Sequence, residues 1–294
     1  MKIIILGSNG QLGKIISNLL LKKKKYKIIN ISRKSFDLID NCKIETHISK
    51  LNSNIIINCA AFTDVDKAEN EKEKCINTNT YLLEYLSNIC NKNNSILFHF
   101  STDYVFDGKK GNYKETDKTL PINYYGYTKK LGENIIKKKL KKFIIIRTSW
   151  LYSNSKNNFF SKIINKIINK EKIQVVDDQF GFPTSAYDLA NVVVNLIEKI
   201  NNKVKFKYGI YHYSNHADKP ISWYDFAIKI NYYFSKYNNK FSEIINISSN
   251  NLNVVAKRPI NSSLNIDKIC NTFNISKKKW DLELKKIIKT KLNL

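Results

Sequence analysis

Three tyrosines and two lysines stand close together in residues 121–133, where a helix is expected to begin. Of these tyrosines, only Tyr125 has a lysine four residues later, at Lys129. Residues four apart share one helix face, so the phenol and the ammonium can point into one site. A neighbouring cation lowers the pKa of tyrosine from about 10, which favours proton donation to a carbonyl oxygen. In a lysine-rich chain with 17 tyrosines, chance alone also supplies such a pair.

A glycine-rich turn joins the first apolar strand to the first helix. Gly7, Gly10 and Gly13 follow a strand expected over residues 3–6 and open a helix expected over residues 11–21. Such glycines permit a tight turn and let a diphosphate approach the backbone at the positive end of the helix. The spacing is GxxGxxG and not GxGxxG. Three of the nine glycines in this one turn nevertheless indicate a dinucleotide site.

The residues after the second strand bear on which dinucleotide binds. This strand is expected over residues 28–31, and Arg33 and Asp37 lie beyond it. A carboxylate at the strand end usually binds the ribose of NAD, whereas an arginine accommodates the 2′-phosphate of NADP. Arg33 therefore favours NADPH, with NADH left open. The alternative is that Arg33 is a solvated surface residue.

Hydroxyl and carboxyl side chains follow the fourth strand, which is expected over residues 96–100. Thr102 and Asp103 stand just beyond that strand. A hydroxyl at this place can hydrogen-bond a substrate carbonyl beside a tyrosine on the next helix. Thr102, Tyr125 and Lys129 in this order form a much more specific signal than any one of them alone.

The elements that position these residues alternate regularly through the first half of the chain. Further strands are expected over 55–59 and 143–146, and helical spacing extends over 75–90 and 131–140. Such alternation is typical of an α/β fold with a doubly wound parallel Rossmann sheet. Sites in such sheets form beyond the carboxyl ends of the strands.

The pattern changes after Trp150, and no long linker or repeat separates the two halves. We expect a dinucleotide-binding Rossmann domain over residues 1–150. Residues 151–294 are expected to form mainly a smaller C-terminal substrate-binding lobe, with some segments returning to the sheet. Its expected helices cover 159–169, 186–200, 223–234 and 277–288, and its expected strands cover 173–176 and 208–213.

Taken together, the glycine turn, Thr102 and the Tyr-x-x-x-Lys pair resemble those of the extended short-chain dehydrogenase/reductases. Within this family the chain is similar to the enzymes that reduce the C4 ketone of dTDP-4-dehydro-L-rhamnose to give dTDP-L-rhamnose. The likeness runs nearly end to end, and the stretches VDKAE and STDYVFDG are its most specific parts. The matching segments are residues 7–13, 58–69, 101–108, 125–133, 147–152, 178–184 and 258–262.

This resemblance implies roles for the matching residues. Tyr125 is the proton donor, Lys129 lowers its pKa and anchors the cofactor ribose, and Thr102 is the partner of the carbonyl. Thr102, Asp103 and Trp150 contact a nucleotide-sugar. The implied cofactor contacts are Gly10, Gln11, Leu12, Asp37, Leu38, Ala60, Ala61 and Thr63.

Two residues of the second half have two interpretations each. Trp150 either packs on the sugar or forms a wedge between the lobes. Arg258 either binds the substrate diphosphate or forms an ion pair between the lobes.

Related sugar 4,6-dehydratases carry an Asp-Glu pair after the threonine, whereas Asp103 here is followed by Tyr104. The missing carboxylate favours reduction alone.

Two other functions remain open. One is another nucleotide-sugar reductase or epimerase of the same superfamily, which as an epimerase would consume no NADPH overall. The other is a non-catalytic regulatory subunit, like the reductase-like partner of methionine adenosyltransferase. The complete set of Thr102, Tyr125 and Lys129 favours catalysis. A homodimer is also left open.

The net charge of +25 is not interpreted as a nucleic-acid site. Only three of the 50 basic residues are arginines, and the abundance of Lys, Asn and Ile is what A/T-rich codons produce. The five scattered cysteines indicate free thiols in a reducing cytoplasm. Neither a signal peptide nor a membrane span is expected, and the four dispersed histidines give no support to a metal site.

Overall fold

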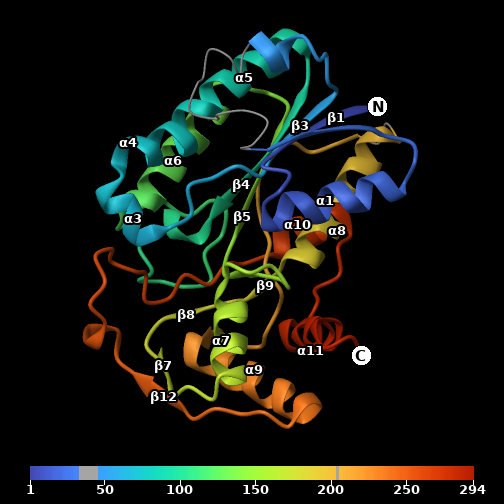
Figure 1. Cartoon of the computed structure of the whole chain (residues 1–294). Coiled ribbons are helices and arrows are strands. Elements are labelled where there is room, and N and C mark those ends of the chain that lie inside the picture. The colour runs from blue at the N-terminus through green and yellow to red at the C-terminus, as the bar shows by residue number, and fades with distance from the viewer. Residues whose placement is uncertain (33–45, 203–204) are drawn as a thin grey trace.

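Six parallel strands form the central sheet of the computed structural model, which describes residues 1–32, 46–202 and 205–294 (Figure 1). Their order is β10-β5-β4-β3-β1-β2, so the strand order reverses beside β1. Such a switch point opens a crevice for ligands at the carboxyl ends of the strands. The strands are β1 (Lys2–Leu6), β2 (Lys27–Ile31), β3 (Ile55–Asn58), β4 (Ile96–Thr102), β5 (Phe143–Thr148) and β10 (Gly209–His212).

Helices cover both faces of this sheet because its central strands are apolar on both sides, as in other parallel sheets. One face packs on α1 (Gln11–Lys22), α8 (Ala186–Asn201) and α10 (Asp267–Phe273). The other packs on α5 (Leu82–Asn93) and α6 (Tyr124–Lys139). Figure 1 shows these two helical layers on either side of the strands. The predicted doubly wound fold is confirmed.

The Rossmann layers draw on both halves of the chain. Strand β10 pairs in parallel with β5, from Gly209 beside Ile144 to His212 beside Arg147. Together with α8 and α10, it brings segments after residue 150 into the sheet and its covering layer. Apolar periodicity predicted β10 and α8 but not α10. It also could not predict that β10 pairs with β5, because pairing between distant strands leaves no local pattern.

The helix expected over residues 75–90 is interrupted. It consists of α4 (Lys72–Ile76), a π-helical turn η1 (Asn77–Tyr81) and α5. The Asn79 side chain accepts a hydrogen bond from the Phe62 N–H (2.9 Å) and donates one to the Phe62 carbonyl (3.1 Å). This anchoring draws the turn toward the loop after β3, and π-turns of this kind often lie at functional sites.

The smaller lobe has its own apolar core below the sheet in Figure 1. It contains α7 (Phe159–Ile168), α9 (Trp223–Asn238) and α11 (Trp280–Lys291), with β7 (Ile173–Val176) paired to β12 (Ile244–Ile247). Shorter elements complete the description: α3 (Val65–Asn70), η2 (Asp103–Val105), β6 (Leu151–Tyr152), β8 (Phe180–Gly181), β9 (Thr184–Ser185), β11 (Ile221–Ser222) and η3 (Ser249–Asn251).

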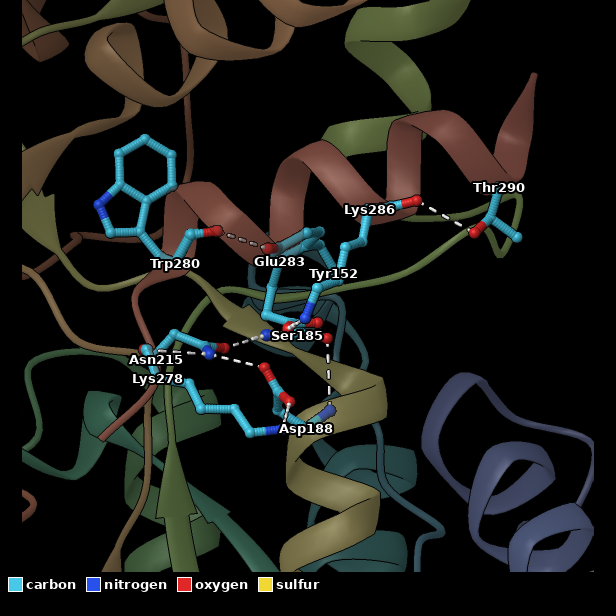
Figure 2. Close-up of polar contacts among 9 residues, drawn as sticks. All are labelled: Tyr152, Ser185, Asp188, Asn215, Lys278, Trp280, Glu283, Lys286 and Thr290. Atoms are coloured by element: carbon cyan, nitrogen blue, oxygen red, sulfur yellow. Dashed lines mark hydrogen bonds and ion pairs between the residues drawn. The ribbon is translucent and has the colours of Figure 1, made fainter. Parts of the chain in front are cut away.

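A buried polar cluster fastens the C-terminal segment to the Rossmann layers (Figure 2). Asp188 on α8 accepts from Lys278 Nζ (2.6 Å) and from Asn215 Nδ2 (2.8 Å). Asn215 Oδ1 in turn accepts from the Ser185 N–H (2.7 Å). Asp188 is 2% exposed, whereas the Lys278 side chain is 43% exposed. Removing the partners of Asp188 would leave a buried carboxylate uncompensated, so the cluster ties the segment before α11 to the start of α8.

Candidate active site

The start of α6 is held by two side chains that satisfy its free N–H groups. Asn123 Oδ1 accepts from the Gly126 N–H (2.8 Å), and Glu69 Oε1 accepts from the Tyr124 N–H (2.8 Å). Asparagine is a preferred N-cap, and a carboxylate suits the positive end of a helix. These contacts fix the first turn of α6 and with it the direction of Tyr125.

A cavity of about 830 Å³ extends between the sheet and the smaller lobe. Twelve of the predicted site residues line it: Gly7, Gly10, Gln11, Leu12, Ala60, Ala61, Thr63, Thr102, Asp103, Tyr125, Lys129 and Trp150. Gly13 and Arg258 lie away from its lining. Arg33, Asp37 and Leu38 fall outside the described residues. The structure thus brings together most of a site that spans 144 residues of sequence.

The glycine turn fits a dinucleotide diphosphate. Gly7 has a φ of +71°, and a Cβ there would lie 2.8 Å from the Ala60 nitrogen. A Cβ on Gly13 would overlap the Gly7 carbonyl oxygen. Gly10 caps α1 without a side-chain bond, and the first turn of α1 carries no acidic residue. The positive end of α1 therefore faces the cavity, and no acidic side chain of its own first turn competes for an anion there.

Tyr125 lies half-buried in the cavity wall next to Thr102. Burial raises the pKa of Tyr125, and a hydrogen bond with the Thr102 hydroxyl opposes that rise. The structure therefore differs from the expected lowering by Lys129. A phenol with a raised pKa keeps its proton through neutral pH, as a donor must until a stronger base forms beside it.

Lys129 is fully buried, and its amine turns toward β4. Its Nζ donates to the Phe100 carbonyl (2.7 Å) and lies 3.1 Å from His99 Nε2. Burial lowers the pKa of Lys129 to about 8, while Glu133 and Cys75 act in the opposite direction. Lys129 is therefore expected to change its charge close to neutral pH.

Trp150 is clamped on both faces. Its ring stacks on Trp223 with centroids 3.7 Å apart and planes 11° from parallel. On the other face, a Cβ on Gly181 would lie 2.9 Å from the indole. The Trp150 backbone has a φ of +45°, a left-handed conformation that is costly for a bulky residue. With both faces covered, the edge of this indole is the part left to line the cavity.

Comparison with known proteins places the chain. The family model described as the RmlD substrate binding domain matches residues 1–293. The chain belongs to the RmlD substrate-binding domain family. It is 36% identical over 287 residues to a dTDP-4-dehydrorhamnose reductase of Aggregatibacter actinomycetemcomitans, covering 97% of this chain and 98% of that protein.

Two solved structures resemble the whole RmlD-family chain. A dTDP-4-dehydrorhamnose reductase of Clostridium acetobutylicum has a TM-score of 0.89 at 33% identity, with 100% of both chains covered. The Bacillus anthracis enzyme of the same name, in complex with NADP, has a TM-score of 0.89 at 32% identity and covers 98% of this chain and 99% of its own. The predicted family and the predicted class of oxidoreductase are confirmed.

Arg258 forms an ion pair in this RmlD-family structure. Its Nη2 lies 2.5 Å from Asp66 Oδ2, and Asp66 also accepts from the Ala256 N–H (3.1 Å). Asp66 belongs to the VDKAE stretch on α3, so the pair joins α3 to the segment after η3. Of the two interpretations of Arg258, the structure displays the ion pair.

Several cavity residues were not predicted. Trp223, Phe159 and Asn158 come from the smaller lobe and line the cavity beside Trp150. A signal for Trp223 was present, because Ser222 and Asp225 form a capping box that starts α9 and fixes Trp223 in its first turn. Asn158 caps α7 and also donates to Gln11 Oε1 (2.7 Å), a contact without any local signature.

The described ranges contain no cluster of three or more potential metal-ligating side chains. Nor do they contain a helix long and apolar enough to cross a membrane. Cys59, Cys75, Cys90 and Cys270 are free thiols, and Cys42 lies outside the described residues.

Proposed function

We propose that this protein uses NADPH to reduce the C4 ketone of dTDP-4-dehydro-L-rhamnose, giving dTDP-L-rhamnose, with Tyr125 as the proton donor. One observation carries the proposal: Thr102, Tyr125 and Lys129 line the same cavity as the glycine turn at the start of α1. The relative from Aggregatibacter bears the name of this activity, and the Bacillus anthracis structure contains NADP. NADH remains a second candidate cofactor.

Each residue has a defined part in the reaction. NADPH supplies a hydride to the carbonyl carbon when it is bound. The carbonyl oxygen then becomes an alkoxide, and Tyr125 transfers its phenolic proton to that oxygen. Thr102 donates a hydrogen bond to the same oxygen, which stabilises the growing charge. Lys129 holds the cofactor ribose and, when charged, stabilises the phenolate left on Tyr125.

The two ends of the cavity differ in their lining residues. The glycine turn and the loop containing Ala60, Ala61 and Thr63 form the cofactor end. Asp103 and the edge of Trp150 form the substrate end, next to aromatic side chains of the smaller lobe. We assign nucleotide-sugar binding mainly to this lobe and cofactor binding to the Rossmann layers.

The test is the loss of NADPH absorbance with dTDP-4-dehydro-L-rhamnose as substrate. Removing a positioned proton donor lowers the rate about 10²- to 10⁴-fold, so we expect Tyr125→Phe to lower kcat by that factor. Tyr127→Phe is the matched control, because Tyr127 lies on the same helix but is exposed and lacks a lysine four residues later.

Three outcomes separate the possibilities. Equal rates for wild type and Tyr125→Phe would remove Tyr125 from the mechanism. Conversion of the sugar without net NADPH oxidation would indicate an epimerase. No oxidation of NADPH or NADH by the wild-type protein would refute the reductase assignment.

A further inference from the structure

A line of buried polar side chains leads from the loop after β3 to Lys129. The Ala60 N–H lies 3.1 Å from Asn58 Oδ1, and Asn58 Nδ2 lies 3.2 Å from His99 Nδ1. On the other side of the ring, His99 Nε2 lies 3.1 Å from Lys129 Nζ. Asn58, His99 and Lys129 are each 1% exposed, so their hydrogen bonds are made within the protein.

The hydrogen bond from the Ala60 N–H determines the orientation of the Asn58 amide. A backbone N–H can only donate, so the amide atom that faces Ala60 must be the oxygen. The amide nitrogen then faces His99 and donates to its Nδ1. Burial lowers the pKa of His99 well below its usual value, so the ring is neutral and carries a single N–H. With Nδ1 accepting, that proton must be on Nε2.

This tautomer places an N–H donor against Lys129. An ammonium has three donors and no lone pair, so a charged Lys129 would face the Nε2–H of His99 donor to donor. An uncharged amine accepts that proton with its lone pair and still donates to the Phe100 carbonyl. The geometry therefore favours the neutral form of Lys129.

We propose that Asn58 and His99 are positioning residues that weaken proton binding at Lys129 by holding the imidazole as its Nε2–H tautomer. The proposal rests on the proposed reductase function only for its consequence, since the charge of Lys129 stabilises the Tyr125 phenolate. Activity should then fall as the pH rises through the ionisation of Lys129.

The other titratable groups around Lys129 do not produce this effect. Glu133 on α6 and Cys75 on α4 both favour the charged form of Lys129. Glu133 is moreover held by Arg147, with 2.7 Å between Oε2 and Nη2. Tyr125, on the same face of α6, is a neutral phenol.

The tautomer can be measured without substrate. The chain has four histidines, so long-range ¹⁵N–¹H spectra of histidine-labelled protein resolve each ring. We expect the His99 proton on Nε2. His212 is an internal control with the opposite tautomer, because Arg147 Nη1 donates to its Nε2 (3.2 Å) and its Nδ1 donates to the Tyr113 carbonyl (3.0 Å). A His99→Gln variant assigns the His99 signals.

Asn58→Asp should reverse the tautomer. A carboxylate accepts the proton of Nδ1, so Nε2 becomes an acceptor for the Lys129 ammonium. We expect the His99 proton to move to Nδ1 while the His212 spectrum stays unchanged. The wild-type His99 proton on Nδ1, or a doubly protonated ring, would overturn the proposal.

The ionisation of Lys129 completes the test. In protein labelled at lysine Cε, Lys129→Met identifies the Lys129 resonance. Once Nε2 accepts a hydrogen bond from the ammonium, the charged form of Lys129 is favoured, so we expect the Lys129 midpoint to rise by at least about one unit in Asn58→Asp. The alkaline limb of kcat/KM should move with it, whereas His216→Gln, at a half-exposed histidine, should move neither.

A Lys129 midpoint that stays in place after the tautomer has reversed would also overturn the proposal. A failure of the reductase assay is a different result. It would refute the proposed function but leave the tautomer and Lys129 measurements as valid tests of the network.

Discussion

Replacing Asp103 by asparagine should make the protein more stable at alkaline pH. Asp103 is 2% exposed, and burial raises its pKa to about 7. Thr102 Oγ1 lies 3.0 Å from its Oδ1, but its Oδ2 has no hydrogen-bond partner among the described residues. The folded protein therefore holds an incompletely paired carboxylate in a dry wall, which costs free energy whenever that carboxylate is ionised.

The size of this cost follows from the shift in pKa. A carboxyl group whose folded pKa exceeds its unfolded value destabilises the folded state at high pH, and the penalty disappears as the pH falls below both values. A rise from 3.8 to about 7 is worth about 4 kcal/mol at pH 8, at about 1.4 kcal/mol per unit. At pH 5 only about 1.5 kcal/mol of the penalty remains.

Asparagine removes this penalty but leaves an unpaired amide, which costs about 1–3 kcal/mol. The variant should therefore gain about 1–3 kcal/mol at pH 8, whereas at pH 5 its effect should lie between a gain of about 0.5 and a loss of about 1.5 kcal/mol. The stability of the variant relative to wild type should differ by about 2.5 kcal/mol between pH 8 and pH 5, and this difference does not depend on the cost of the amide. For 294 residues the unfolding entropy is about 0.6 kcal/mol per degree. The Tm of Asp103→Asn minus the Tm of wild type should therefore be about 4 °C larger at pH 8 than at pH 5.

Scanning calorimetry of both proteins at pH 5 and pH 8 measures this difference directly. Burial lowers the pKa values of His99 and His212, which opposes the Asp103 effect, but both histidines are present in both proteins and cancel. Asp107→Asn is a control that should lose stability about equally at both pH values, because a hydrogen bond from Tyr113 lowers the pKa of Asp107 and the resulting stabilisation is already complete at pH 5. The reasoning fails if the Asp103→Asn difference does not grow from pH 5 to pH 8.

Three further substitutions address other parts of the site. Gly13→Ala should weaken NADPH binding about tenfold or more, measured by fluorescence titration, because the new methyl overlaps the Gly7 carbonyl and opens the turn. Gly181→Ala should displace the Trp150 ring and raise KM for the sugar without changing the Kd for NADPH; an unchanged KM would show that the clamp does not shape the substrate end. Asp66→Asn should lower Tm at pH 7 but less so toward pH 3. Desolvation raises the pKa of Asp66, but the hydrogen bonds from Arg258 and Ala256 outweigh it and lower that pKa. The stability that Asp66 contributes is therefore lost as the pH falls.

The sequence was most informative where the signal was local. Tyr125 and Lys129 are neighbours on one helix face, and the glycine turn is contained within seven residues. The position of Thr102 followed from the rule that sites form beyond the carboxyl ends of parallel strands. Because each of these signals depends on short-range geometry, the sequence was sufficient to predict the central part of the cavity.

Contacts between distant segments could not be predicted in the same way. The clamp on Trp150 requires Gly181 and Trp223, which approach it only after the smaller lobe has folded. The direction of the Lys129 side chain depends on His99, and the sequence shows His99 only as one position within an otherwise apolar strand. Spacing predicted that phenol and ammonium share a helix face, but it could not show that the amine turns toward β4.

Burial has the same effect on three titratable groups of the cavity wall and on His99, which lies behind Lys129. It raises the pKa values of Tyr125 and Asp103 and lowers those of Lys129 and His99, so each group is driven toward its neutral form. Beside such buried groups, a charge on a bound substrate oxygen would be screened less by water than in solution. In the proposed mechanism, hydrogen bonds donated to that oxygen are therefore worth more than they would be in solution. The burial that makes Asp103 costly for stability is thus also the condition that the proposed mechanism requires, in which Thr102 stabilises an alkoxide and Tyr125 protonates it.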